Sequence, residues 1–280
     1  MNSKLLTRYG LKFHPFRPDI PFEAIFVTRE LESFCKRIEF AVADGGYGLI
    51  TGEPGTGKSV TLRLLSRRLS QIRDVTVGAI THPQSKAGDF YRELGELFGV
   101  PFQHHNRWGG FKALRQRWAE HIASTLTRPV LIVDEAQQML VSVLNELRLL
   151  ASKEFDSRAL LCVVFAGDQR LLDRFRHPDL VPLASRIRRR LVMDYATPDA
   201  LCACLDHLLD AAGNSALMTD ALKNTLVEHA AGNYRVLMNL ADELLCAAAE
   251  RELAQLDEKL FLDVHQPINP GKRRAARSGR

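Results

Sequence analysis

The sequence of 280 residues has few cysteines, no long apolar run and almost no net charge outside its C-terminal end. Its five cysteines are an odd number and lie mostly among apolar residues, which favours reduced thiols over a disulfide scaffold. No apolar run approaches the roughly 18–20 residues that cross a bilayer, and the first residues do not resemble a secretory signal. These absences predict a cytoplasmic protein with no membrane partner.

The positive charge of the chain is concentrated in one short segment. Lys and Arg number 38 against 33 Asp and Glu, and the last nine residues hold five basic residues and no acidic one. The rest of the sequence is therefore balanced, and the pI of about 9.0 comes from the C-terminal end. Because proline and glycine precede this basic run, residues 266–280 are predicted to form a disordered basic tail.

Short apolar runs alternate with helix-length segments over the first 195 residues. The predicted strands are 47–51, 75–80, 130–133, 160–166 and 191–193, and the predicted helices are 60–69, 88–98, 111–126 and 141–151. This alternation predicts an α/β fold in which helices flank a mainly parallel sheet. Only helices follow, at 200–212, 220–231 and 236–256. We therefore expect a core of residues 1–195 that includes an N-terminal extension, and a small helical lid domain of residues 196–265.

One segment matches a phosphate-binding loop at every defining position and lies between a predicted strand and a predicted helix. Its residues, with the first residue after it, are Gly52, Glu53, Pro54, Gly55, Thr56, Gly57, Lys58, Ser59 and Val60. Glycines allow successive backbone N–H groups to face phosphate oxygens, and the helix adds its positive N-terminal end. Lys58 would reach the β and γ phosphates, and Ser59 would ligate magnesium. The segment therefore predicts ATP and Mg²⁺ as ligands.

Two acids follow the apolar run Pro129–Val133. Ligands of open α/β sheets bind at the carboxyl ends of strands, which is where Asp134 and Glu135 would lie. Asp134 would hold magnesium, and Glu135 would polarise the water that attacks the γ-phosphate. The alternative is that both acids only cap a helix. Together with the phosphate-binding loop, they predict an ATPase that forms ADP and phosphate.

Further short motifs accompany these two elements along the chain. They are Tyr9-Gly10-Leu11, His14-Pro15-Phe16, Val133-Asp134-Glu135-Ala136-Gln137, Phe165-Ala166-Gly167-Asp168, Ser185-Arg186-Ile187 and Gly232-Asn233-Tyr234-Arg235. With them, the chain resembles P-loop ATPases of the AAA+ superfamily, specifically the ExeA-like group and the related transposition regulators of the TnsC, TniB and Mu B type. The resemblance covers roughly residues 8–250.

The resemblance implies roles for several further residues. Residues 160–166 would form the strand between those of the phosphate-binding loop and the acidic motif, so Asp168 or Gln169 would occupy the sensor position. An acid facing phosphate is electrostatically unfavourable, which makes Gln169 the alternative to Asp168. Arg235 would reach from the lid to the γ-phosphate, and His82 would restrain the catalytic glutamate.

An arginine that acts on a neighbouring subunit's nucleotide is also implied, and Arg186 matches its position. Three further arginines follow at 188–190, so a solvated basic face or a DNA contact is an alternative for this cluster. A second basic cluster contains Arg107, Lys112 and Arg115. Lys112 and Arg115 are one helical turn apart and could face DNA phosphates, or the cluster could simply be a solvated face. Trp118 shares helical spacing with apolar neighbours and is expected in the core.

The resemblance implies a DNA-transposition helper. Such a protein binds ATP, assembles with itself into a ring or filament on duplex DNA, and recruits or activates a DDE-type transposase. The first alternative is a secretion-apparatus assembly ATPase of the ExeA type. Proteins of that type continue into a membrane span and a peptidoglycan-binding region, and we expect neither here. The second alternative is a nucleotide switch without turnover, against which Lys58, Asp134 and Glu135 count.

Overall fold

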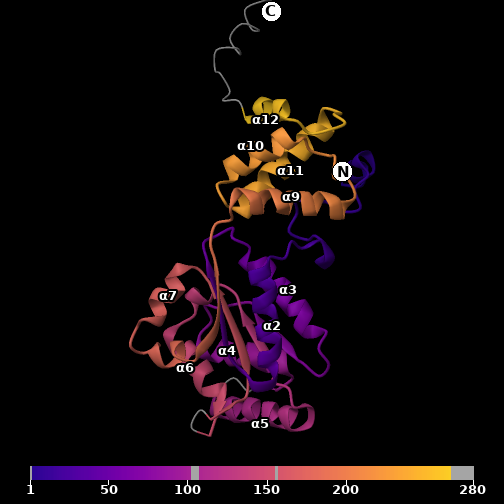
Figure 1. The fold of residues 1–280 in the computed structure, drawn as a ribbon. Coiled ribbons are helices and arrows are strands. Elements are labelled where there is room, and N and C mark those ends of the chain that lie inside the picture. The colour runs from indigo at the N-terminus through magenta and orange to yellow at the C-terminus, as the bar shows by residue number, and fades with distance from the viewer. Residues whose placement is uncertain (1, 102–106, 155–156, 266–280) are drawn as a thin grey trace, which may run out of the picture. The chain divides into compact units, whose positions relative to one another are not determined.

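The structure, a computed structural model, describes residues 2–101, 107–154 and 157–265. The predicted basic tail, residues 266–280, lies outside the described residues. The chain divides into two compact units (Figure 1). One unit is Val27–Tyr195, and the other combines the residues up to Phe26 with those from Ala196 onward. We call them the core unit and the helical unit.

The core unit contains a five-stranded sheet with the order β2-β3-β6-β1-β7. Its strands are β1 (Gly46–Gly52), β2 (Val77–Ile80), β3 (Val130–Val133), β6 (Cys162–Gly167) and β7 (Ile187–Met193). All neighbouring pairs are parallel. Every residue of β3 and β6 is buried, as expected when both faces of a parallel sheet are covered. The predicted α/β fold is confirmed, and β6 lies between β1 and β3 as the resemblance implied.

Helices surround this sheet in Figure 1. They are α2 (Arg29–Asp44), α3 (Lys58–Ser70), α4 (Ala87–Phe98), α5 (Arg107–Thr125), α6 (Val141–Leu150), α7 (Gln169–Phe175) and α8 (Val181–Ala184). A 3-10 turn, η2 (Ala136–Gln138), follows β3, and a two-stranded hairpin joins β4 (Ser152–Lys153) to β5 (Arg158–Ala159). Sequence reasoning missed α2, although Thr28 caps it by accepting a hydrogen bond from Leu31 N.

Strand β7 begins earlier than predicted and includes all three arginines at 188–190. Ile187 and Leu191 are buried, while Arg188 and Arg190 between them are exposed. Because β7 is an edge strand of the sheet, charged residues can alternate there with buried ones. The arginine cluster therefore belongs mostly to a strand, and Arg186 lies just before it.

The helical unit is built from α1 (Asn2–Tyr9), the turn η1 (Phe22–Ala24), α9 (Pro198–Ala212), α10 (Asp220–Ala230), α11 (Tyr234–Glu250) and α12 (Glu258–His265). Tyr9, Leu11 and Phe16 are part of its apolar core. The Tyr9 hydroxyl donates to Leu253 O at 3.0 Å, and Lys12 N donates to Ala212 O at 2.8 Å. The prediction assigned these N-terminal residues to the core. The structure corrects this because their apolar side chains are buried against the C-terminal helices.

The third predicted helix of this unit ends at Glu250 instead of continuing to residue 256. Glu252 has a left-handed backbone with φ of 57°, which ends the helix without a glycine or proline to mark it. The chain then turns back, and Leu256 N donates to Leu217 O at 2.9 Å. This backbone pairing stabilises the turn that leads into α12.

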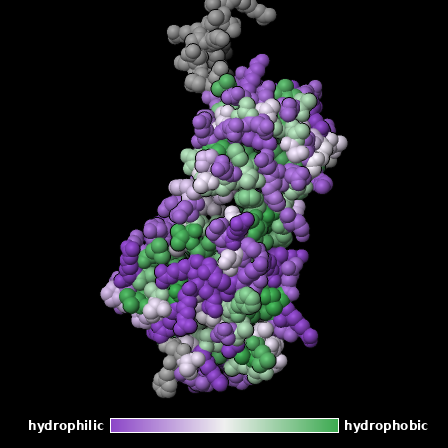
Figure 2. All heavy atoms as spheres, viewed as in Figure 1, coloured by the Kyte–Doolittle hydropathy of each residue, from purple (hydrophilic) through white to green (hydrophobic). Residues whose placement is uncertain are grey.

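Hydrophilic side chains cover much of the surface seen in Figure 2, with apolar ones in separate patches. Among the residues that the structure describes, no helix is both long and apolar enough to cross a membrane.

Candidate functional site

The phosphate-binding loop connects the end of β1 to the start of α3. Gly55 and Gly57 have positive φ values of 89° and 100°, a region that L side chains rarely adopt. A Cβ atom on Gly52 would lie 2.3 Å from Met193 O, so no larger residue fits there without a shift of the backbone. The glycines therefore shape a loop that ends at the positive N-terminus of α3, a suitable site for phosphate.

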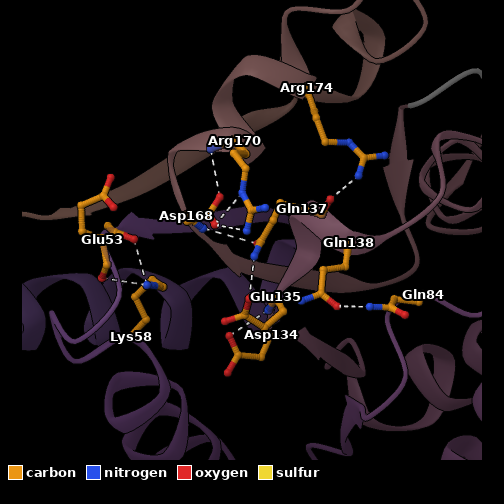
Figure 3. Close-up of polar contacts among 11 residues, drawn as sticks. Glu53, Lys58, Gln84, Asp134, Glu135, Gln137, Gln138, Asp168, Arg170 and Arg174 are labelled. Atoms are coloured by element: carbon orange, nitrogen blue, oxygen red, sulfur yellow. Dashed lines mark hydrogen bonds and ion pairs between the residues drawn. The ribbon is translucent and has the colours of Figure 1, made fainter. Parts of the chain in front are cut away.

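Lys58 is buried beneath this loop, with 7% of its surface exposed. Its ammonium donates to Gly52 O at 2.8 Å and to Glu53 O at 3.0 Å (Figure 3). An ammonium has three donors, so one remains for a phosphate oxygen. The carbonyl oxygens of the loop thus keep the Lys58 ammonium next to the loop backbone.

Ser59 and Asp134 meet although they are 75 positions apart in the sequence. The Ser59 hydroxyl donates to Asp134 Oδ2 at 3.1 Å, while Asp134 Oδ1 accepts from Glu135 N at 2.9 Å. A hydroxyl and a carboxylate are oxygen ligands of the kind that Mg²⁺ prefers, with phosphates and waters completing its shell. No cluster of three or more His, Cys, Asp or Glu residues that could hold a metal occurs among the described residues. The pair therefore fits a magnesium ion that arrives with a nucleotide.

Glu135 follows Asp134 with a left-handed backbone, φ of 51°, and its side chain is exposed. Its Oε2 accepts a hydrogen bond of 2.5 Å from Gln137 Nε2 and a longer one of 3.5 Å from Gln138 Nε2. Sequence reasoning assigned no role to either glutamine, although Gln137 is the last residue of the acidic motif. Their positions two and three residues after the acid are visible in the sequence, but they do not give the direction of the side chains.

The residue after β2 that links to this group is Gln84, not His82. Gln84 Nε2 donates to Gln138 Oε1 at 2.6 Å, as Figure 3 shows. His82 Nδ1 instead lies 2.9 Å from the Thr81 hydroxyl. The prediction that His82 restrains the glutamate is therefore corrected: the same loop contributes an amide two residues later.

Asp168 is the N-cap of α7, and its charge is balanced locally. One carboxylate oxygen accepts from Arg170 N at 2.9 Å, and the other accepts from the Arg170 guanidinium at 2.9 and 2.5 Å. These bonds lower the pKa of the Asp168 carboxyl. The electrostatic objection to an acid at this position is therefore weaker than the sequence suggested. Gln169 is exposed at the first position of α7, and its sensor role stays a prediction.

The two arginines implied by resemblance lie in different units. Arg186 follows α8 directly before β7, and its guanidinium donates to Pro182 O. Arg235 is in the first turn of α11, where its backbone N–H donates to Asn233 Oδ1 at 3.0 Å. Their contacts with nucleotide remain predictions.

The basic cluster on α5 is engaged by its own surroundings. Arg107 forms an ion pair with Glu146, and Arg115 donates to Leu149 O at 2.9 Å. The Lys112 ammonium lies 5.2 Å from the centre of the Trp108 ring, which is 64% exposed. Trp118 is buried as predicted, with 1% of its surface exposed.

Comparison with known proteins shows which proteins this chain is similar to. Residues 42–175 match the family model of the AAA domain. General secretion pathway protein A of Aeromonas hydrophila is 29% identical over 248 residues, which cover 87% of this chain but 44% of that protein. The chain thus spans less than half the length of this curated relative.

Two solved structures show the same fold at low identity. Cdc6p of Pyrobaculum aerophilum matches with a TM-score of 0.69 at 15% identity, covering 86% of this chain and 67% of that one. The ORC1 protein of Aeropyrum pernix, in complex with DNA, matches with a TM-score of 0.67 at 18% identity, covering 89% of this chain and 67% of that one. The chain therefore shares the fold of these two proteins, and its residues 42–175 are similar to the AAA domain. The resemblance to transposition regulators stays a prediction from the sequence.

Proposed function

We propose that this protein binds ATP with Mg²⁺ and hydrolyses it to ADP and phosphate. The backbone N–H groups of the loop at residues 52–59 and the third donor of Lys58 would hold the phosphates. Ser59 and Asp134 would hold the magnesium ion, which would neutralise phosphate charge when bound.

Glu135 is the proposed base for the attacking water. Its carboxylate is exposed, belongs to the residue directly after Asp134, and accepts a hydrogen bond from Gln137 that fixes its direction. A base must lie within reach of the proton that it removes, so orientation matters as much as basicity. The observation that carries the proposal is the 3.1 Å bond between Ser59 and Asp134, because it brings two separate sequence motifs into one site.

Substitution of Glu135 by Gln tests the catalytic assignment. We expect ATP affinity to be retained while the turnover number falls by about 10²–10⁴-fold, since the general base is lost and the shape is kept. Glu96→Gln, at an exposed position of α4, is the matched control and should leave turnover unchanged. Wild-type turnover in Glu135→Gln, measured as phosphate release, would refute the assignment.

An assembly of several copies is part of the proposal. Arg186, in the loop between α8 and β7, is the residue proposed to act on the nucleotide of a neighbouring copy. A guanidinium in such a role can contribute about 10³–10⁵ in rate. The ORC1 neighbour, solved in complex with DNA, supports DNA as a further partner.

We propose two alternative biological processes. The relative named as a secretion-pathway protein supports a role of the ExeA type, in assembly of a secretion apparatus. The transposition role, with a DDE-type transposase as partner, rests on the sequence resemblance alone. ATP-dependent binding to duplex DNA separates the two roles, because only the transposition role requires it.

A further inference from the structure

The amide of Gln137 connects two parts of the candidate site. We propose that Gln137 is a positioning residue for Glu135: it directs the carboxylate of the proposed base and fastens it to the end of β6. This inference rests on the proposed ATPase function, and it assigns a role to a residue that does not itself contact the substrate.

Both ends of the Gln137 amide have partners. Nε2 donates to Glu135 Oε2 at 2.5 Å, and Oε1 accepts from Asp168 N at 3.4 Å. A reversed amide would set its oxygen against the carboxylate and its NH₂ against the N–H, so only one orientation satisfies both contacts. With 6% of its surface exposed, Gln137 is buried, and water competes little for these bonds.

The surrounding backbone is shaped to admit this amide. A Cβ atom on Gly167 would lie 2.5 Å from Gln137 Oε1, so the glycine at the end of β6 leaves room for the contact. On the other side, the Arg174 guanidinium donates to Gln137 O and, at 2.5 Å, to Met139 O. Figure 3 shows Gln137 between Glu135 and Asp168, with Arg174 extending from α7 toward the same loop. Side chain and backbone of Gln137 are thus held from two elements.

Glu135 depends on this support more than a residue of regular structure would. Its backbone is left-handed, its side chain is exposed, and its other side-chain donor, Gln138, is exposed and farther away at 3.5 Å. Without Gln137 the carboxylate would sample several rotamers, and a base displaced by about 1 Å can lose on the order of 10²-fold in rate.

The test compares Gln137→Met with wild type at saturating ATP. Methionine keeps the length of the side chain without its donor and acceptor, so we expect the turnover number to fall about 10- to 100-fold while ATP affinity stays within about twofold. The matched control is Gln116→Met on α5, which removes a 2.9 Å bond from a glutamine to Glu120 away from the site and should change neither value. An unchanged or increased turnover number in Gln137→Met would overturn the proposal.

A double substitution separates positioning from a general structural role. In the Glu135→Gln background the base is already lost, so adding Gln137→Met should lower turnover by less than about twofold. A purely structural role would lower thermal stability and ATP affinity in both backgrounds, and that result would also overturn the proposal. If Gln137→Met does not fold, Gln137→Glu preserves the shape and replaces the donor by an acceptor; it must then show the loss of turnover at saturating ATP.

Failure of this inference and failure of the proposed function give different results. If the wild-type protein does not hydrolyse ATP, the proposed function itself is wrong, and if Glu135→Gln retains turnover, Glu135 is not the base. If Glu135→Gln loses turnover and Gln137→Met does not, only the positioning role is wrong.

Discussion

Two groups of charged and polar side chains in the core unit differ in how they are assembled. The first lies at the ends of β1, β3 and β6 and contains Lys58, Ser59, Asp134, Glu135 and Asp168, which come from three separate segments. The second lies on the single helix α5, where Arg107 and Arg115 bond to groups of α6 and Lys112 packs over Trp108.

The difference shows why charge alone is a weak guide to a binding site. At the strand ends, sheet topology brings together residues that no local requirement would place in contact, and parallel α/β sheets bind ligands at that edge. On α5, helical spacing alone accounts for the cluster, and the partners within the fold account for two of its three charges. We therefore expect substitutions in the first group to change ATP affinity strongly and those in the second group to change it little.

The strongest test of this comparison is removal of one lysine from each group. Lys58→Ala takes away the ammonium that the loop holds for phosphate, and we expect ATP affinity to fall by about 100-fold or more, because charge-assisted contacts to phosphate are lost. Lys112→Ala removes the same side chain from α5 and should leave ATP affinity unchanged. Titration with a fluorescent ATP analogue gives both values.

Similar losses of ATP affinity in the two variants would break the comparison. Thermal unfolding of both variants is the necessary control, because Lys58 is buried and bonded to two carbonyl oxygens whereas Lys112 is exposed. Only a loss of affinity in a folded protein counts as evidence about the site.

A smaller effect would sharpen the account of the first group. Arg170→Ala leaves the carboxylate of Asp168 without its guanidinium partner, and we expect about fivefold weaker ATP binding from the exposed negative charge. Asp168→Asn in the same chain should restore the affinity, because the double variant has no unbalanced charge. Isothermal titration at low salt measures each step.

Arg176→Ala is the matched control for this pair. Arg176 forms an ion pair with Asp173 at 2.9 Å, one turn away at the end of α7. The substitution therefore removes a similar exposed ion pair outside the site. Equal losses for Arg170→Ala and Arg176→Ala would mean that Asp168 does not face the nucleotide.

Much of the first group was predictable from sequence because its motifs have fixed spacing. Lys58 and Ser59 follow a glycine pattern, and Asp134 follows a buried strand, so the fold and the two halves of the site could be inferred together. Sheet order followed from resemblance, since the position of β6 between β1 and β3 is a property of topology. The phosphate-binding loop and the strand before Asp134 depend on backbone geometry, which short sequence motifs specify.

The contacts that complete the site depend on side-chain direction and were not predictable. Gln137 reaches Glu135 because the latter has a left-handed backbone, and nothing in the residue type indicates that conformation. Gln84, and not His82, links the loop after β2 to this group. Which of the two reaches it depends on the geometry of the loop, which the sequence does not give. The packing of Tyr9 with C-terminal helices was missed because a short N-terminal segment shows no periodicity that identifies its partner.

The smallest expected effect concerns DNA and the second group. Lys112 is exposed and has no acidic partner among the residues that the structure describes, whereas Arg107 is paired with Glu146. If α5 faces duplex DNA, Lys112→Gln should weaken binding by about two- to threefold and reduce the salt slope of the binding constant by about one, as expected for loss of one phosphate contact.

Arg115→Gln should have less effect, because its guanidinium already donates to Leu149 O. Fluorescence anisotropy with a labelled duplex and a non-hydrolysable ATP analogue, at several salt concentrations, measures both. Equal slopes for Lys112→Gln and wild type would leave α5 as a solvated helix face, and DNA contact would then have to come from other residues.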